Sequence, residues 1–268
     1  MNHLATLTVM VGYDEREHDA YQVCYDSIVR RSSMPVRVVP LVEHHLRQAG
    51  FYNRRWYRDE TGQKRDMLDK KPFSTDFAFS RFLVPALSLY QGWTLFCDCA
   101  FLFTADLATL FALADDRYAV MCVKHEHVPT ETEKMDGVEQ TQYRRKNWSS
   151  LVLWNCAHPA NAHVSSSCVN KMTGQWLHAF TWLKDNLIGA LPPTWNHLVG
   201  YDIVPRETIP CGIHFTSGIP TMPGHEDDIY ADLWRAERDS RRLPGKPLPL
   251  ERLRGLAAKF QPEEGVAL

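Results

Sequence analysis

A single carboxylate follows an apolar run in the middle of the chain. Residues 93–97 (Trp-Thr-Leu-Phe-Cys) lead directly to Asp98, and the sequence then continues with Cys-Ala-Phe-Leu-Phe. An apolar run without a helical stripe indicates a strand buried on both faces, with Asp98 at its carboxyl end. Open α/β sheets bind ligands beyond the carboxyl ends of their strands. Asp98 is therefore either a carboxylate that contacts a ligand or a residue that caps a turn.

Other polar residues are expected at the same edge of the sheet. Tyr13 and Asp14 follow the first apolar strand of the chain, and His214 comes where a later strand ends. Arg81 lies on a helix just before the Asp98 strand, from which its guanidinium could clamp a phosphate with two hydrogen bonds. Each of these residues has a structural alternative, namely a turn-forming aspartate, a core histidine or a surface arginine.

Two Trp-Asn pairs suit carbohydrate binding. Trp154 and Asn155 end a predicted strand, whereas Trp195 and Asn196 follow a double proline that makes the chain rigid and extended. An indole can pack on the C–H groups of a sugar ring while the amide binds its hydroxyls. We expect these four residues to contact an acceptor sugar. Ordinary core packing of the two tryptophans is the alternative.

The periodicity predicts the elements that position these residues. A strand at 7–11, a helix at 16–32 and a strand at 36–42 form a right-handed βαβ unit. Further strands and helices follow, and the arginine-rich, aromatic stretch at 44–71 has no clean period and indicates a surface excursion. We expect one α/β domain over residues 1–225, with a mostly parallel sheet flanked by helices. Residues 226–268 form a helical C-terminal extension packed on the same domain.

Composition excludes several classes of protein. The 268 residues include 30 basic and 32 acidic side chains, so the formal charge of −2 gives no support to nucleic-acid binding. Seven cysteines without a regular framework indicate reduced thiols and a cytoplasmic protein. No signal peptide is apparent, and no apolar run approaches the roughly 18 residues of a transmembrane helix. Peripheral contact with a membrane surface stays open.

Six motifs in order resemble the nucleotide-diphosphosugar transferases of the GT-A (Rossmann-like) fold, and most closely the family-8 glycosyltransferases, which include glycogenin and lipopolysaccharide glycosyltransferases. They lie at residues 11–14, 81–85, 96–100, 149–155, 191–196 and 214–220. The resemblance implies transfer of a hexose from a nucleotide-diphosphate sugar, with a UDP-sugar favoured, to a carbohydrate or glycolipid acceptor. It further implies retention of anomeric configuration and a role in bacterial surface polysaccharide or lipopolysaccharide synthesis, in the cytoplasm or at the inner face of the membrane.

The resemblance also implies roles for individual residues. Asp98 and His214 correspond to ligands of a Mn²⁺ (or Mg²⁺) ion that holds the diphosphate of the donor. Tyr13 and Asp14 correspond to residues that line the base and ribose site, and Arg81 lies close to the donor. A hard divalent ion prefers oxygen ligands, and the leaving diphosphate needs positive charge beside it.

The remaining assignments rest on looser matches. Lys146 and Asn147 are predicted donor contacts on their charge and position alone. Asp185 falls where the family has an acidic or amide residue beneath the anomeric carbon, although the glutamine that usually follows is Asn186 here. Together with Asp98, Asp185 is the predicted catalytic carboxylate.

Ala100 departs from the family pattern, because it stands where the second metal-binding aspartate belongs. Three explanations are open. The alanine is a substitution made to trap or inactivate the enzyme, which the retained flanking sequence favours; or Lys146, Arg81 or the arginines at 144–145 replace the metal; or catalysis is lost and binding is kept. The alternative function is accordingly a non-catalytic nucleotide-sugar or carbohydrate-binding protein. A sugar-nucleotide pyrophosphorylase is disfavoured, since no Gly-rich phosphate loop follows the first strand.

Overall fold

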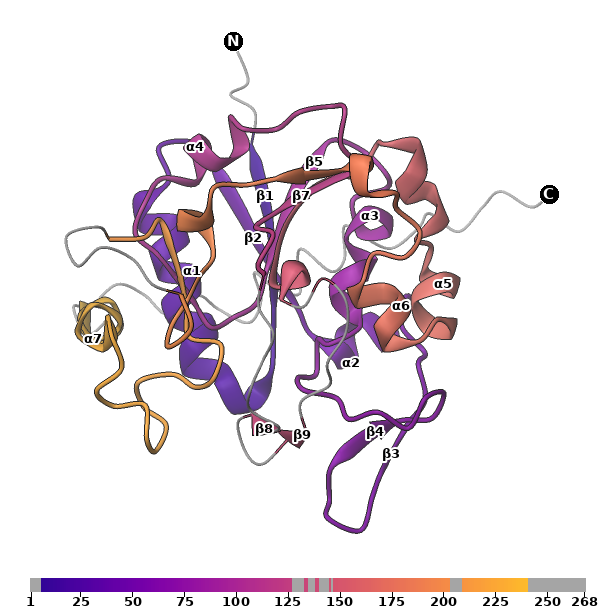
Figure 1. Cartoon of the computed structure of the whole chain (residues 1–268), viewed down its shortest axis with the longest axis horizontal. Coiled ribbons are helices and arrows are strands. Elements are labelled where there is room, and N and C mark those ends of the chain that lie inside the picture. The colour runs from indigo at the N-terminus through magenta and orange to yellow at the C-terminus, as the bar shows by residue number, and fades with distance from the viewer. Residues whose placement is uncertain are drawn as a thin grey trace.

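A six-stranded sheet forms the centre of the protein (Figure 1). The computed structural model describes residues 6–126, 133–134, 138–139, 145, 147–202 and 209–240. The strands of the sheet lie in the order β11-β7-β10-β5-β1-β2, and within this sheet β10 alone runs antiparallel to its neighbours. Their bounds are β1 (Leu7–Gly12), β2 (Val36–Leu41), β5 (Trp93–Cys97), β7 (Val120–Cys122), β10 (Leu151–Asn155) and β11 (Ile188–Ala190). The predicted mostly parallel sheet is confirmed.

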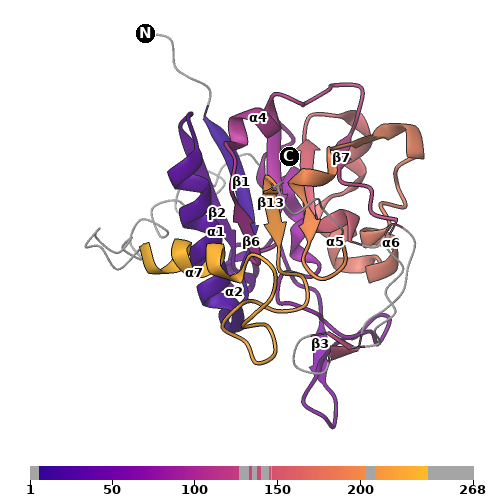
Figure 2. The same cartoon turned by 60° about the vertical axis from the view of Figure 1, so that its left-hand side comes forward.

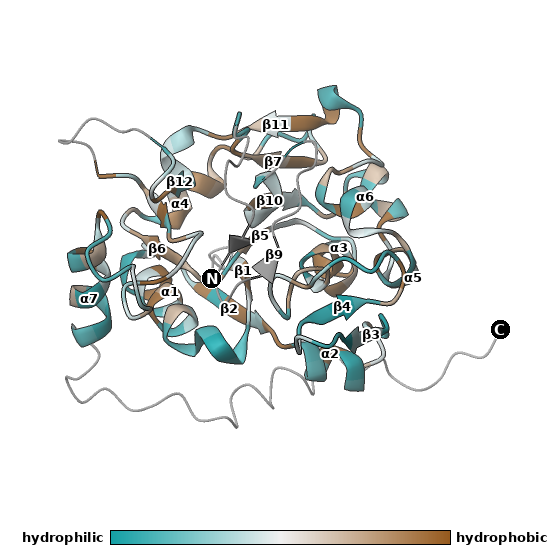
Figure 3. Ribbon diagram, turned by 60° about the horizontal axis from the view of Figure 1, so that its bottom comes forward, coloured by the Kyte–Doolittle hydropathy of each residue, from teal (hydrophilic) through white to brown (hydrophobic). Residues whose placement is uncertain are grey.

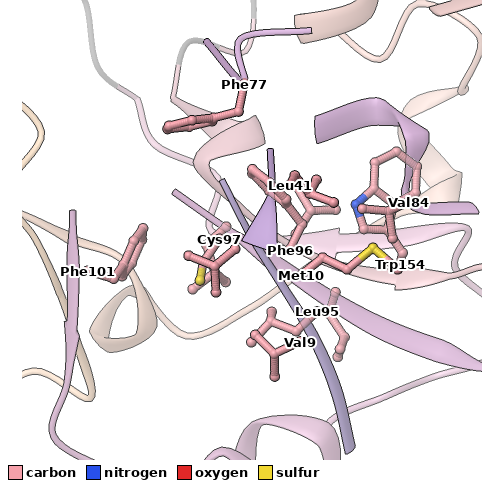
Figure 4. Packing of buried hydrophobic residues seen from close by; sticks show 14 of the residues in the cluster. Val9, Met10, Leu41, Phe77, Val84, Leu95, Phe96, Cys97, Phe101 and Trp154 are labelled. Atoms are coloured by element: carbon pink, nitrogen blue, oxygen red, sulfur yellow. The ribbon is translucent and has the colours of Figure 1, made fainter. Parts of the chain in front are cut away.

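Strand β5 lies between β1 and β10, as expected for the apolar run before Asp98. Leu95, Phe96 and Cys97 are completely buried, and Figure 4 shows them packed beside Met10 of β1. The chain then turns at residues 99–100 and enters β6 (Phe101–Phe103). With β12 (His197–Leu198) and β13 (Gly212–His214), β6 forms a second sheet that the sequence did not indicate.

The helices lie on both sides of the central sheet, as predicted (Figures 1 and 2). Helices α1 (His18–Arg31) and α7 (Ala231–Asp239) share one side, and α3 (Val84–Leu87), α5 (Ser166–Lys171) and α6 (Gly174–His178) lie on the opposite side. The other two α-helices of the described residues are α2 (Glu43–Gln48) and α4 (Leu107–Phe111). Short 3₁₀ turns are η1 (Glu15–Glu17), η2 (Ser80–Leu83), η4 (Trp148–Ser150), η5 (Pro159–His163), η6 (Asp185–Leu187) and η7 (Pro193–Trp195).

The predicted βαβ unit is present as β1, α1 and β2. The two strands pair in parallel from Leu7 with Val36 to Gly12 with Leu41. Gly12 ends β1 beneath the ring of Phe77, where a Cβ atom would lie only 2.3 Å from the ring. Only glycine lets the ring pack on the backbone there, so this residue fixes how the segment that follows β4 covers the carboxyl end of β1.

The stretch predicted as a surface excursion contains a β-hairpin. Strands β3 (Trp56–Arg58) and β4 (Lys64–Asp66) pair with each other and project from the body of the protein (Figure 1). Figure 3 shows β4 and α2 as hydrophilic, in contrast to the hydrophobic strands β7 and β11 of the central sheet. A second small hairpin consists of β8 (Glu133–Lys134) and β9 (Val138–Glu139).

Helix α7 lies in the described part of the predicted C-terminal extension, and it packs on α1. Glu237 pairs with Arg31 at 2.7 Å and with Arg30 at 2.9 Å, while Trp234 is completely buried. Residues 241–268 of the predicted helical extension lie outside the described residues. Within the described part of the chain, no helix has the length and apolar character needed to cross a membrane.

Candidate functional site

A cavity of about 240 Å³ opens at the carboxyl end of β5. Four of the residues predicted to bind the donor or a metal line it, and they come from four separate segments: Arg81 from η2, Asp98 after β5, Asn147 before η4 and His214 from β13. The structure therefore places Asp98, Arg81 and His214 at one edge of the sheet, as expected, together with Asn147, which was predicted from its charge and position alone.

Arg81 and Asp98 form an ion pair in the wall of this cavity. Nη1 of Arg81 lies 2.7 Å from Oδ1 of Asp98, and the arginine side chain is buried. The same Nη1 donates a hydrogen bond of 3.1 Å to the carbonyl of Ser149. The guanidinium also lies over the rings of Phe77 and Phe96, at 5.2 and 5.3 Å from their centroids. Arg81 is therefore held in one orientation before any ligand arrives.

A chain of hydrogen bonds orients His214. The Ser150 hydroxyl donates to the carbonyl of Asn147 at 2.8 Å, so its oxygen is available to accept from Nδ2 of Asn196 at 2.9 Å. This arrangement turns Oδ1 of Asn196 toward Nδ1 of His214, 3.1 Å away. Because an amide oxygen only accepts, Nδ1 carries the ring proton and Nε2 is unprotonated in the neutral ring. Nε2 faces Oδ2 of Asp98 at 4.0 Å.

Gly212 allows β13 to approach this hydrogen-bonded chain. A Cβ atom on Gly212 would lie 2.3 Å from the backbone carbonyl oxygen of Trp195. Since a backbone atom cannot move aside like the end of a flexible side chain, glycine is needed at this position. The close approach sets the distance between Asn196 and His214.

The residues at the predicted metal position do not form a divalent-metal site. Between them, Asp98 and His214 offer a metal ion only two ligand atoms, Oδ2 and Nε2, which lie 4.0 Å apart. Asp98 is also paired with Arg81. Ala100 lines the cavity with a methyl group where a third ligand is needed. Among the side chains that the structure describes, no group of three or more His, Cys, Asp or Glu could hold a metal ion. We therefore assign no step to Mn²⁺ or Mg²⁺.

Glu17 is a cavity residue that the sequence reasoning missed. It lies at the end of η1, is 4% exposed, and accepts a hydrogen bond of 2.9 Å from the thiol of Cys99. Burial is the main cause that raises the pKa of Glu17 to about 7; the hydrogen bond from Cys99 opposes this shift, and the carboxylates of Asp14 and Asp98 add to it. The available signal was the acidic residue three positions after Asp14 at the same strand end.

This raised pKa predicts that Glu17 makes the stability of the protein depend on pH. Stability from the protonated carboxyl is fully present below its ordinary pKa of 4.5 and is lost as the pH rises through about 7. Glu17→Gln cannot ionise, so its free energy of unfolding should lose roughly 2–3 kcal/mol less than the wild type between pH 4.5 and 8. Urea denaturation at several pH values measures this difference. Glu15→Gln, at an exposed neighbouring position, is the control; parallel curves for wild type and Glu17→Gln would contradict the prediction.

Asp14 is committed to contacts within the protein. Its carboxylate accepts from Nε and Nη2 of Arg16 at 3.1 and 2.8 Å and from the backbone N–H of Asp76 at 3.0 Å. Burial alone would raise the pKa of Asp14, but these partners hold it below its usual range. The hydroxyl of Tyr13 lies 3.1 Å from Nδ1 of His18. Asp14 thus fixes the segment containing Ser74, which lines the cavity, and the donor contacts predicted for Tyr13 and Asp14 stay predictions.

The Trp-Asn pairs lie outside the cavity lining, contrary to the expected acceptor contact. Trp154 is buried in β10, where it stacks on Trp182 with 6.3 Å between ring centroids. Asn155 donates to the carbonyl of Tyr118 at 3.3 Å. Trp195 is also buried, and Asn196 serves to orient His214. The core alternative for these tryptophans describes their observed positions.

The structure describes the position of Asp185 but not that of Lys146. Asp185 begins η6 with its side chain 67% exposed, pairs with Arg145, and is absent from the cavity lining. The catalytic role of Asp185 stays a prediction. Lys146 lies outside the described residues, whereas its neighbour Asn147 lines the cavity in a left-handed conformation with φ of 62°.

Ser149 and His178 form a further polar pair in the cavity that the sequence did not indicate. The Ser149 hydroxyl lies 2.8 Å from Nδ1 of His178, at the end of α6. The histidine ring also packs edge-on against Phe82, with 5.1 Å between centroids. Since the carbonyl of Ser149 binds Arg81, this residue connects His178 with the Arg81–Asp98 pair.

Two solved glycosyltransferases share this fold. The apo form of glycosyltransferase GlyE from Streptococcus pneumoniae TIGR4 aligns with a TM-score of 0.57 and 16% identity, over 96% of this chain and 63% of GlyE. The bifunctional glycosyltransferase WbbM, also in its apo form, aligns with a TM-score of 0.57 and 14% identity, over 96% of this chain and 52% of WbbM. The chain thus spans less than two thirds of either protein. These similarities establish the GT-A fold.

Sequence comparison identifies a nearer relative. No family model matches the chain. Protein CDI of Arabidopsis thaliana is 48% identical over 234 residues, which cover 86% of this chain and 85% of Protein CDI. Identity at this level over most of both chains shows common descent and a shared fold. The chain belongs to the family of Protein CDI.

Proposed function

We propose that this protein is a glycosyltransferase that moves a sugar from a nucleotide-diphosphate sugar, preferably a UDP-sugar, to a hydroxyl of a carbohydrate or glycolipid. The observation that carries the proposal is the convergence of Arg81, Asp98, Asn147 and His214 on one cavity at the carboxyl end of β5. The fold shared with GlyE and WbbM supports it. Ligands of open α/β sheets bind at this edge.

Arg81 is the residue we assign to the diphosphate. Departure of a nucleoside diphosphate concentrates negative charge on its oxygens, and a preorganised cation in a buried site stabilises that charge most effectively. Arg81 is such a cation, because Asp98 and the carbonyl of Ser149 fix its guanidinium. Lys71, which also lines the cavity, adds a second positive charge. We assign the amide of Asn147 to the diphosphate or the sugar, with Lys146 beside it in sequence.

Asp98 has two tasks in this proposal. Its Oδ1 holds Arg81, and its Oδ2, facing His214 at 4.0 Å, can accept hydrogen bonds from hydroxyls of the donor sugar. His214 has an unprotonated Nε2 in its neutral form and can accept in the same way. The two side chains would thus position the sugar, while Arg81 meets the leaving group.

The acceptor is assigned to the α6 side of the same cavity. Asp69, Gln175 and His178 line it there and offer hydrogen-bond groups for a sugar hydroxyl, whereas the Trp-Asn pairs lie in the protein core. Retention of configuration and a role in bacterial surface polysaccharide synthesis at the inner membrane face stay predictions from the family resemblance. The occurrence of a relative in a plant widens the range of acceptors to be tested.

Thermal unfolding with a panel of UDP-, GDP- and ADP-sugars tests the proposal. A ligand at 100 times its Kd stabilises the folded protein by about 2.7 kcal/mol, which should raise Tm by roughly 5–10 °C for the correct donor. We expect this rise in Tm to persist in EDTA, because the side chains around Asp98 and His214 do not form a metal site. The absence of a shift with every nucleotide-sugar, with EDTA or with Mn²⁺, would contradict the proposal.

Release of the free nucleoside diphosphate separates an enzyme from a binding protein. A glycosyltransferase should hydrolyse the stabilising donor slowly even without acceptor, and this hydrolysis should stop in Asp98→Asn. A protein that binds the donor but releases no diphosphate with any acceptor would be the non-catalytic alternative suggested by Ala100. Arg117→Gln, at an exposed arginine outside the cavity lining, is the control for both measurements.

A further inference from the structure

The hairpin β3–β4 and the turn after it form an arm, residues 55–71, that projects from the body of the protein (Figures 1 and 2). Two large apolar side chains stand next to each other on its turn. Met67 is 44% exposed and Leu68 is 53% exposed. Trp56, also exposed, lies on β3, where Lys64 packs over its ring at 4.8 Å. Two adjacent exposed apolar side chains on a projecting turn suit contact with a partner surface.

The exposed charges of the arm are mostly positive. It contains six basic and four acidic residues, although the whole chain has a formal charge of −2. Two of the acidic residues are engaged within the protein, since Asp66 is buried against Arg54 and Asp59 pairs with Arg65. The charged side chains of the arm in the exposed class are the cations Arg55, Arg58, Lys70 and Lys71, and the single anion Glu60. Met67 and Leu68 thus lie in a cationic surface.

The turn that presents Met67 and Leu68 is fixed rather than loose. The backbone N–H of Asp66 donates to the carbonyl of Lys71 at 2.9 Å, and that of Lys70 donates to the carbonyl of Asp66 at 3.0 Å. Met67 donates across the hairpin to the carbonyl of Arg55 at 3.0 Å. These bonds hold the apolar pair outward and close to Arg55. A preformed surface of this kind loses little entropy when a partner binds.

The arm also borders the proposed active site. Asp69, Lys71 and Pro72, which follow the apolar pair in the same segment, line the cavity. Any surface that contacts Met67 and Leu68 therefore lies next to the cavity. A lipid-linked acceptor would reach the cavity without leaving such a surface.

We propose that the arm docks on an anionic phospholipid membrane, with Met67 and Leu68 entering the interface and Arg55 and Lys70 facing the lipid phosphates. The chemistry of the partner follows from the combination of exposed apolar side chains with a cationic surround, which is the pattern of interfacial binding. The suggestion of a lipid-linked acceptor rests on the proposed function; the docking itself does not.

Co-sedimentation with vesicles tests the docking. The full chain should bind vesicles of phosphatidylcholine with about 30% phosphatidylglycerol and should bind pure phosphatidylcholine at least tenfold more weakly, because each basic side chain near an anionic surface favours binding by about fivefold. Raising the salt concentration should release the protein. Met67→Ser with Leu68→Ser, and separately Arg55→Gln with Lys70→Gln, should each weaken binding by about tenfold or more.

Matched controls distinguish the arm from general surface effects. Ile229→Ser changes an isoleucine that is 52% exposed, close to the value for Leu68, but outside the arm, and Arg117→Gln does the same for charge; both should bind vesicles like the wild type. Equal binding of all variants, or no binding to anionic vesicles, would overturn the proposal. Loss of a dimer in the arm variants, measured by sedimentation velocity without lipid, would instead identify a second copy as the partner and also overturn it. Thermal shifts with nucleotide-sugars are measured on the same variants, so failure of docking is distinguishable from failure of the proposed function.

Discussion

Replacing Arg54 by methionine should lower the free energy of unfolding by roughly 3–5 kcal/mol, because the change leaves a buried carboxylate without its partner. Arg54 and Asp66 are both buried and form two hydrogen bonds, of 3.1 and 2.6 Å. The guanidinium also donates to the carbonyls of Val169 and Met172, at 2.9 and 2.7 Å. One side chain thus joins the base of the arm to α5, and its loss leaves several polar groups unsatisfied.

Urea denaturation of Arg54→Met measures this effect. The double variant Arg54→Met with Asp66→Leu removes the isolated carboxylate and should recover a large part of the loss. Arg117→Met, which breaks an exposed arginine–aspartate pair, should leave the unfolding midpoint nearly unchanged. A loss of less than about 1 kcal/mol for Arg54→Met would show that the pair does not anchor the arm.

Strand-end reasoning predicted the part of the site that depends on the backbone topology. An apolar run that ends in a carboxylate has few structural solutions, and β5 with Asp98 at its end is one of them. The expectation that Arg81 and His214 lie beside Asp98 also agrees with the cavity lining, although Arg81 reaches it from the turn η2 and His214 from β13 of the second sheet. It did not indicate β6 and β13 as a second sheet, since short apolar strands carry no signal for which sheet they join.

Side-chain roles that depend on tertiary packing were not predictable in the same way. A tryptophan followed by an asparagine has the same sequence pattern in a sugar site and in a core strand, so the pattern predicts an acceptor contact for Trp154, which is buried. The same pattern predicts a sugar contact for Asn196, whose amide instead orients His214. Glu17 and His178 reach the cavity from the ends of helical turns, and their proximity to Asp98 and Ser149 arises only when the chain folds.

The pairing of Arg81 with Asp98 changes how the alanine at position 100 is interpreted. With a second aspartate at position 100, the site would hold two carboxylates against one arginine and would favour a divalent cation. With alanine at position 100, Asp98 is the one carboxylate of the motif, and Arg81 balances it at 2.7 Å. This balance supports the explanation in which a basic residue replaces the metal. The contributions of Arg81 and Asp98 to ligand binding can therefore be measured by mutating each residue separately.

Arg81→Gln should weaken the binding of UDP by about 10- to 100-fold in EDTA, because hydrogen bonds to charged groups contribute about 1.5–3 kcal/mol each. Glutamine retains two N–H donors but no charge, and Arg81→Lys, which retains the charge without the planar fork, should lie between the two. Isothermal titration calorimetry with UDP gives the affinities, and thermal unfolding of the unliganded variants identifies any loss of folded protein.

Asp98→Asn provides the decisive comparison for the same titration. If Arg81 holds the diphosphate, removal of the Asp98 charge makes the electrostatic potential at the phosphate position more positive. UDP should then bind in EDTA as tightly as before or several-fold more tightly. If a divalent ion at Asp98 holds the diphosphate instead, the wild type should require Mn²⁺ and Asp98→Asn should lose affinity. The two mechanisms therefore predict opposite changes for one substitution, and the sign of the change decides between an arginine and a metal as the cation beside the leaving group.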